Sequence, residues 1–153
     1  MIARKRKTAG TTDTRRQMAE LQIELRETDR ELGKLNWDLA TELIRLSDET
    51  NDPAALIEAV EALRSATRYY TFEDAPREHA LVQKRLADTL LVLGQRTDDR
   101  DALASARDAY RGAITLASLL SDDALREDLR ATYKITLALL GDAPKTAPLF
   151  RVA

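Results

Sequence analysis

The sequence repeats itself with a period of 47 residues, and this repeat constrains the fold more than any other feature. Shifting the chain by 47 positions superposes equivalent residues from three segments. Internal repetition of this length is typical of proteins built from stacked supersecondary units. The superposed residues are Leu43, Leu90 and Leu137, then Leu46, Leu93 and Leu140, then Ser47, Gly94 and Gly141, and in the first two units Ala59, Leu63 and Ala66 with Ala106, Tyr110 and Ala113.

Composition indicates that the repeated units are helical. Ala and Leu dominate the 44% of residues that are hydrophobic, and the chain has only five Gly and four Pro. Ala and Leu lose little side-chain freedom in a helix, whereas Gly and Pro interrupt one. The predicted fold class is therefore all-α, with antiparallel helix hairpins. Helices are predicted near residues 14–50, 53–70, 76–96, 99–119 and 122–141.

Polar residues mark the starts of several predicted helices. Asp52 precedes Pro53, which predicts a capping residue followed by the first helical residue. Asp98 or Asp99 is expected to cap the fourth helix, and Ser121 is expected to cap the fifth.

Small residues recur where two helices of a unit are expected to cross. In the second unit Gly94 is expected to meet Ala106 and Ala113, with Tyr110 filling the remaining space. This pattern resembles the tetratricopeptide repeat, in a variant whose period of 47 residues exceeds the usual ~34. The resemblance implies a short solenoid of stacked hairpins.

The resemblance also implies a binding surface, because in this family the first helix of each hairpin lines a concave face that holds protein segments. Leu39, Leu43 and Leu46 are expected to form the core stripe of the first helix. Trp37 is either the anchor of the interface or a core residue beneath the N-terminal helix. The residues expected to contact a partner are Trp37, Thr41, Ile44, Lys84, Asp88, Leu91, Ile135 and Ala138.

The predicted N-terminal helix carries a heptad pattern that runs to Leu46, and Thr14 with Gln17 is expected to form a capping box at its start. Such spacing is typical of a coiled coil. Either the helix packs along the first hairpin as a cap, or its stripe pairs with a second copy of the chain. The residues of the candidate dimer seam are Met18, Leu21, Leu25, Leu32 and Leu35.

The two ends of the chain differ from its centre. Residues 1–16 contain six Lys or Arg and one Asp, whereas the remainder contains 18 basic and 25 acidic residues. Residues 1–13 are predicted to be a basic disordered tail and residues 14–141 the helical domain. A short basic segment can contact an anion such as a nucleic-acid phosphate. The candidate anion contacts are Arg4, Lys5, Arg6 and Lys7.

Residues 142–153 form a Pro-containing apolar tail, because Pro144 and Pro148 preclude a regular helix there. Leu149, Phe150 and Val152 are expected to fold back over the 122–141 helix, to dock on a second molecule, or to act as a recognition motif.

No catalytic, cofactor-binding or metal site is predicted. The chain has no Cys and a single His, His79, which is expected to be an exposed structural residue. Capping and the helix dipole account for the acidic clusters at helix starts. No set of nucleophile, base and orienting group is recognisable. No apolar run approaches the ~20 residues of a membrane span, and no secretory signal is recognisable, so a cytoplasmic location is expected.

Three functions fit these features, and none of them is enzymatic. The leading prediction is an adaptor or scaffold that binds a protein or peptide on the concave face of its hairpins. The alternative is a homo-oligomeric structural or regulatory protein that assembles through the N-terminal heptad helix. The third is nucleic-acid binding through the basic tail, which the acidic remainder of the chain opposes.

Overall fold

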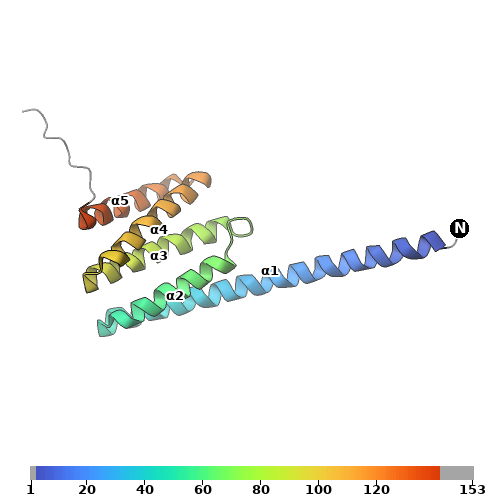
Figure 1. Ribbon diagram of the computed structural model, residues 1–153, viewed down its shortest axis with the longest axis horizontal. Coiled ribbons are helices and arrows are strands. Elements are labelled where there is room, and N and C mark those ends of the chain that lie inside the picture. Colours follow the sequence, from blue (N-terminus) through green and yellow to red (C-terminus); the bar gives the residue numbers. More distant parts are fainter. Residues whose placement is uncertain (1–2, 142–153) are drawn as a thin grey trace, which may run out of the picture.

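The computed structural model describes the backbone of residues 3–141 and the side chains of residues 10–141. This part of the chain is all-α, which confirms the predicted fold class (Figure 1). The three residues of the expected C-terminal strap, Leu149, Phe150 and Val152, lie outside it. The five helices are α1 (Ala3–Thr50), α2 (Pro53–Tyr69), α3 (Pro76–Thr97), α4 (Arg100–Leu119) and α5 (Asp123–Leu140).

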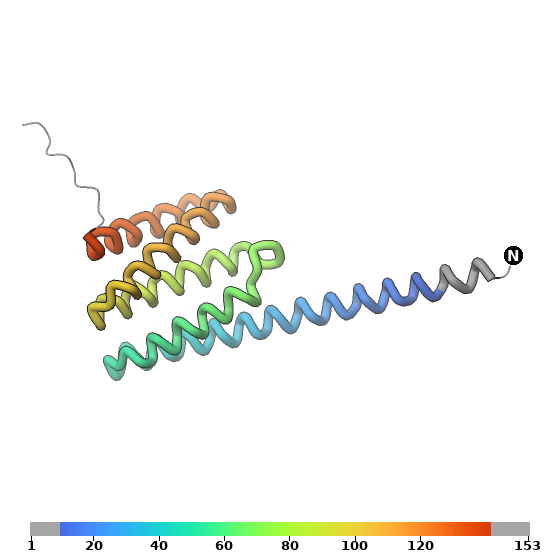
Figure 2. The backbone as a smooth tube through the Cα atoms, viewed as in Figure 1, coloured from blue at the N-terminus to red at the C-terminus, as the bar shows by residue number. Residues whose placement is uncertain are grey.

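Neighbouring helices pack as antiparallel pairs in chain order. Helix α1 packs on α2, α2 on α3, α3 on α4, and α4 on α5. Helix α1 is much longer than the others, and its N-terminal half projects beyond the bundle (Figure 2). The described part of the chain therefore consists of a compact body and a projecting helix.

The turns that close the first two hairpins reproduce the 47-residue repeat. Asn51 and Asp98 occupy equivalent positions, and both adopt the left-handed conformation with φ near 55° and 52°. Each is followed by an aspartate, Asp52 or Asp99, whose carboxylate caps the next helix by accepting hydrogen bonds from its first backbone N–H groups. The predictions of Asp52 and Asp99 as caps are confirmed.

The cap of α5 differs from the prediction by one residue. Asp122 caps this helix, and its carboxylate accepts a 3.0 Å hydrogen bond from the N–H group of Leu125. Ser121 precedes the cap and has a φ of 55°. The reason is that Ser121 takes the place of Asn51 and Asp98 in the same turn geometry, which moves the capping role to the aspartate after it.

The alanines of the repeat are the centre of the core. Ala59 and Ala66 of α2 are fully buried, as are their equivalents Ala106 and Ala113 of α4. Tyr110 fills the space between the latter two and is itself fully buried. Gly94, however, does not meet the alanines first: a Cβ on Gly94 would lie 2.7 Å from the Leu103 side chain, one turn earlier.

Helix α1 begins at Ala3 rather than near residue 14. Thr14 therefore lies inside the helix, where its hydroxyl donates a 2.8 Å hydrogen bond to the carbonyl oxygen of Gly10 instead of capping a helix start. The segment before Thr14 contains no proline and only one glycine, so little in it opposes a helix. The expected disordered tail over residues 1–13 is corrected to helical backbone from Ala3 onward.

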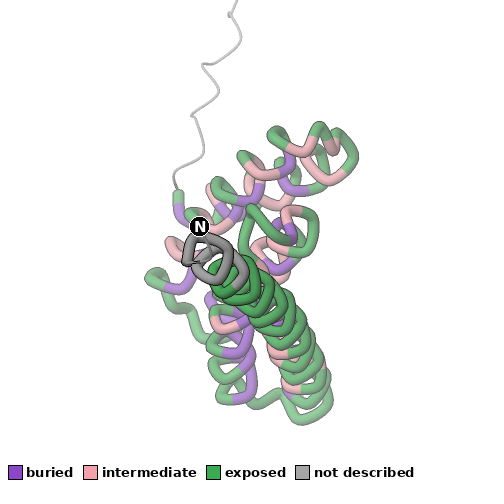
Figure 3. Tube along the Cα trace, turned by 90° about the vertical axis from the view of Figure 1, so that its right-hand side faces the viewer, coloured by how far each residue is buried: buried purple, intermediate pink, exposed green. Residues whose placement is uncertain are grey.

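The face of α1 that packs on the body differs from the predicted stripe. Leu39 and Leu46, expected in the core, are 52% and 44% exposed. The buried residues are instead Gly33, Ala40 and Ser47, which are spaced seven apart. Small side chains on this face allow α1 to approach α2 closely, and the leucines are left on another face. Most of α1 is exposed, whereas buried residues concentrate in the other helices (Figure 3).

Helix α5 ends the stack and packs mainly on α4. Its buried residues are Leu129, Thr136 and Leu140. Ile135 and Leu139 on its other faces are exposed. Gly141, at the superposed third-unit position, adopts a left-handed φ of 76° and ends the helix.

Candidate protein-interaction surfaces

One candidate surface lies where α1 and α3 run side by side, and specific contacts hold it in place. The guanidinium of Arg85 lies 5.7 Å from the ring centre of Trp37, a cation–π contact between α3 and α1. At the other end of the pair, Arg96 donates to the Ser47 hydroxyl at 2.9 Å and to Asp48 at 2.6 Å. These contacts fix the spacing between the two helices.

A groove of about 340 Å³ remains between α1 and α3. Among the predicted partner-contacting residues, Ile44 and Asp88 line it. Sequence reasoning missed Arg85, Val92 and Arg96, because the repeat alone does not say how far apart α1 and α3 stand. The lining residues are Ile44, Asp48, Leu56, Arg85, Asp88, Thr89, Val92 and Arg96.

Lys84 and Asp88 belong to an ionic cluster between α3, α4 and α5. Lys84 lies 2.9 Å from Asp88 and 3.1 Å from Asp128. The Tyr110 hydroxyl donates a 2.6 Å hydrogen bond to Asp88. Partial burial lowers the pKa of Lys84, but its hydrogen bonds to Asp88 and Asp128 outweigh that effect and raise it. Burial, together with the hydrogen bond to Asp88, raises the pKa of Tyr110.

The other predicted contact residues are dispersed. Leu91 is 7% exposed and packs in the core, which corrects its assignment to an accessible surface. Leu91 belongs to the cluster of buried core residues that also contains Leu129 and Leu140 of α5. Thr41 is half-buried, whereas Ile135 and Ala138 are exposed on α5 and do not line the α1–α3 groove.

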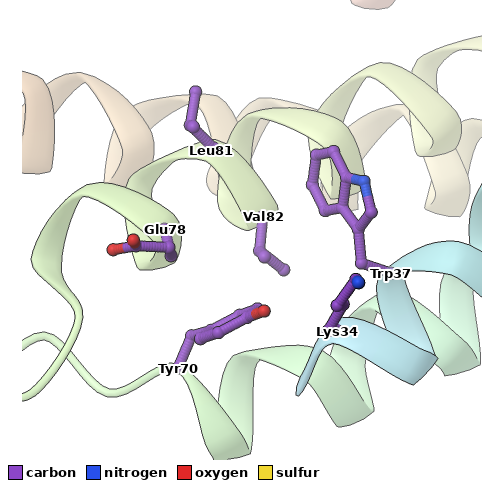
Figure 4. A pocket seen from close by; sticks show the side chains of 6 residues that line it. All are labelled: Lys34, Trp37, Tyr70, Glu78, Leu81 and Val82. Atoms are coloured by element: carbon purple, nitrogen blue, oxygen red, sulfur yellow. The ribbon is translucent and has the colours of Figure 1, made fainter. Parts of the chain in front are cut away.

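Trp37 is both a packing residue and the wall of a small cavity. Its half-buried ring packs against the core, and it also lines a cavity of about 170 Å³ with Tyr70 and Val82 (Figure 4). The ring of Tyr70 lies so close to Gly33 that a Cβ there would be 2.9 Å from it. The two interpretations of Trp37 as core and as surface therefore each describe one side of its indole.

The second candidate surface is the outer face of α1. Its leucines and methionine are exposed over almost the whole length, and only Leu32 is half-buried. We call this stripe the α1 seam; it consists of Met18, Leu21, Leu25, Leu32, Leu35, Leu39 and Leu46. The interpretation of this stripe as buried within the same molecule is wrong. The exposure arises because the small residues on a different face of α1 provide the contact with the body.

The basic residues near the N-terminus, Arg4, Lys5, Arg6 and Lys7, belong to the helical backbone of α1, but their side chains lie outside the described part. Their role in binding an anion stays a prediction.

His79 takes part in the structure through its ring. Its Nδ1 atom lies 2.5 Å from the carbonyl oxygen of Tyr70, which ties the start of α3 to the end of α2. The ring is half-buried rather than exposed as expected. Within residues 10–141, no group of three or more acidic, His or Cys side chains is arranged to hold a metal ion.

None of the described helices is long and apolar enough to cross a membrane. No family model, no curated protein and no solved structure matches this chain. The stacked antiparallel helix pairs are shown by the structure, and membership of the tetratricopeptide family stays an interpretation of the repeat.

Proposed function

We propose that this chain is a non-catalytic assembly module in which two copies associate through the α1 seam. One observation carries the proposal: α1 packs on its own body with one face and exposes a mostly apolar stripe, interrupted at Thr28 and Glu42, on another. The alternative prediction from the sequence, a homo-oligomeric structural or regulatory protein, is thus the one that the exposed surface favours. The body is then a rigid unit that the paired helices hold in place.

The two faces of α1 are separate because of helical geometry. Successive residues of an α-helix are about 100° apart, and Leu32, Leu39 and Leu46 each immediately precede a residue of the buried face, so the seam is turned by about 100° from that face, which consists of Gly33, Ala40 and Ser47. A helix that lies against the seam therefore does not compete with α2. Pairing requires no rearrangement of the body.

Pairing also explains how the projecting half of α1 is stabilised. Helices without a packed face are marginal in water even when their residues favour helix formation. The projecting half exposes Met18, Leu21 and Leu25, and full burial of a side chain of this kind contributes about 1.5–3 kcal/mol. A second copy that covers this stripe would supply the missing tertiary contact.

The experiment compares two glutamate substitutions only two residues apart. Leu25 lies in the seam and is 62% exposed, whereas Ile23 is 56% exposed but points to the opposite side of the helix. Light scattering at micromolar concentration is expected to give a dimer for the unmodified chain and for Ile23→Glu, and a monomer for Leu25→Glu. An unmodified chain that stays monomeric over the whole accessible concentration range would overturn the proposal.

A second function, that of an adaptor for a protein segment, is favoured by the groove between α1 and α3. The Nε atom of Arg85 is buried at this groove and has no hydrogen-bond partner within the described residues. Because this Nε atom is itself buried, a ligand would contact the guanidinium through its terminal N–H groups, and a carboxylate is their strongest acceptor. We infer that the occupant is a protein segment that carries an acidic side chain beside an apolar one, because Ile44 and Val92 form the apolar part of the groove.

A random peptide array tests this second function. Peptides retained by the unmodified chain are expected to be enriched in Asp and Glu, and Arg85→Gln is expected to abolish that enrichment. The control is Arg64→Gln on α2, because Arg64 does not line this groove and pairs with Glu61. Retained peptides whose selection does not depend on Arg85 would contradict the assignment of the groove.

A further inference from the structure

The residues at the edges of the α1 seam contain information about how a second copy lies against it. Glu24, Glu31 and Asp38 each immediately precede a leucine of the seam, so they follow one edge at seven-residue intervals. On the opposite edge, Arg15 and Asp29 occupy equivalent positions two heptads apart. In paired helices, residues at these edges face the other helix and determine its direction.

A parallel pair would bring like charges together. A residue on the edge that contains Glu24 would then face the residue five positions later on the opposite edge of the second copy. Glu24 of each copy would therefore face Asp29 of the other. Glu42, which occupies a seam position between Leu39 and Leu46, would face its own counterpart across the interface. Like charges at these positions disfavour association.

An antiparallel pair centred on Ile23 brings two apolar residues of the projecting half together. With this centre, Leu21 of one copy faces Leu25 of the other, and Met18 faces Thr28. The segment that pairs spans residues 14–32. It ends before Gly33, the first described residue of α1 that is buried against the body, and its last part, from Arg26 onward, lies beside the loop between α2 and α3, where Asp29 is half-buried.

The same centre brings opposite charges together at the edges. Arg15 of each copy faces Asp29 of the other, which gives two attractive pairs by symmetry. The only like-charged pair that this centre creates within residues 14–32 is Glu24 with its own counterpart. Glu42 falls outside the paired segment, and its carboxylate already binds Arg45 of its own chain at 2.9 Å.

We propose that the two copies pair antiparallel through the projecting half of α1, with the two bodies at opposite ends of the paired helices. This inference rests on the proposed function, because it specifies the geometry of the same seam. It also specifies the partner as a second copy, since the basic Arg15 and the acidic Asp29 that complement each other belong to one sequence.

The chain contains no Cys, so single cysteines report the direction of pairing without interference. The two test variants are Met18→Cys in the seam and Thr28→Cys between Leu25 and Leu32 of the seam, and both positions are exposed. A disulfide requires Cα atoms within about 7 Å. In the antiparallel pair, a cysteine at position 18 faces position 28 of the other copy, whereas identical positions are ten residues apart along the axis, or about 15 Å.

Each variant is first oxidised alone. The two variants are also mixed under reducing conditions, and the mixture is then oxidised. Covalent dimers are measured on a non-reducing gel in each case. We expect covalent dimers only in the mixture. Dimers formed by either variant alone would establish parallel pairing and overturn this inference, while the proposed function would stand. No covalent dimer in the mixture, with the unmodified chain dimeric by light scattering, would also overturn it. An unmodified chain that is monomeric would instead overturn the proposed function.

Discussion

Gly94 and Leu103 touch across the α3–α4 hairpin so closely that a Cβ on Gly94 would lie 2.7 Å from both Cγ and Cδ2 of Leu103. The same Cβ would lie 3.1 Å from the carbonyl oxygen of Asp99, which is part of the turn. The absence of a side chain at position 94 therefore determines how closely the two helices approach. The turn cannot move aside without losing the cap of α4.

Gly94→Ala is accordingly expected to destabilise the fold by about 1–3 kcal/mol, the usual effect of overpacking a tight contact, despite the better helix propensity of Ala. The matched control is Gly112→Ala on α4, where a Cβ would meet nothing within 4 Å. There the propensity gain of about 1 kcal/mol should appear as stabilisation. Urea unfolding of both variants measures the difference. Equal stability of the two variants would contradict the close contact.

The hydroxyl of Tyr110 makes stability depend on alkaline pH. Burial and the hydrogen bond to Asp88 raise its pKa above the ordinary value of 10.0. The stabilising contribution of the neutral phenol is complete below pH 10 and is lost as the pH rises toward the folded-state pKa, because the unfolded chain ionises first. Tyr110→Phe should lose about 1–3 kcal/mol at neutral pH.

The pH series distinguishes this effect from a simple packing defect. Urea unfolding is measured at neutral pH and at several values above pH 10. The free energy of unfolding of the unmodified chain should fall more steeply there than that of Tyr110→Phe. Parallel curves would show that Tyr110 does not retain its proton in the fold.

The start of α5 provides a test of which residue caps it. Asp122→Ala should cost about 1 kcal/mol, because it removes the acceptor for the N–H group of Leu125. Ser121→Gly should be neutral or stabilising, since glycine adopts the φ of 55° at this position without steric cost. Thermal unfolding of the two variants measures both effects. A larger loss for Ser121→Gly than for Asp122→Ala would assign the cap to Ser121.

Charge reversal tests the contact between Arg15 and Asp29 of two copies. Arg15→Asp and Asp29→Arg should each weaken self-association, because each one turns two attractive pairs into repulsive ones. When the two variants are mixed, both edges become complementary again, so heterodimers should form in preference to either homodimer. Sedimentation with one variant labelled measures this exchange. Random assortment in the mixture would contradict the contact.

The sequence predicted the hairpins and their turns well, because local chemistry determines both. Asp52 and Asp99 lie in equivalent turns. A carboxylate directly before a helix accepts hydrogen bonds from the first backbone N–H groups of that helix, so its capping role can be predicted from its position. The buried alanines could be predicted for a similar reason: a small residue that recurs at a helix crossing indicates close approach.

The orientation of α1 could not be predicted, because two stripes on this helix compete for the core. A heptad of leucines indicates an apolar face but does not say which chain covers it. The seven-residue spacing of Gly33, Ala40 and Ser47 was the sequence signal for the intramolecular contact. The contact between Arg85 and Trp37 depends on helix spacing, which residue types alone do not specify.

Because α1 is one uninterrupted helix from Ala3 to Thr50, it acts as a lever arm fixed at one end. The distance from Gly33 to Ala3 along the axis is about 45 Å, so a tilt of about 5° at the body displaces the free end by about 4 Å. The helix would pivot at the contact of Trp37 with Arg85. Arg85 also lines the groove between α1 and α3. A ligand that widens this groove slightly would thus produce a sideways movement of about 4 Å at the far end of α1.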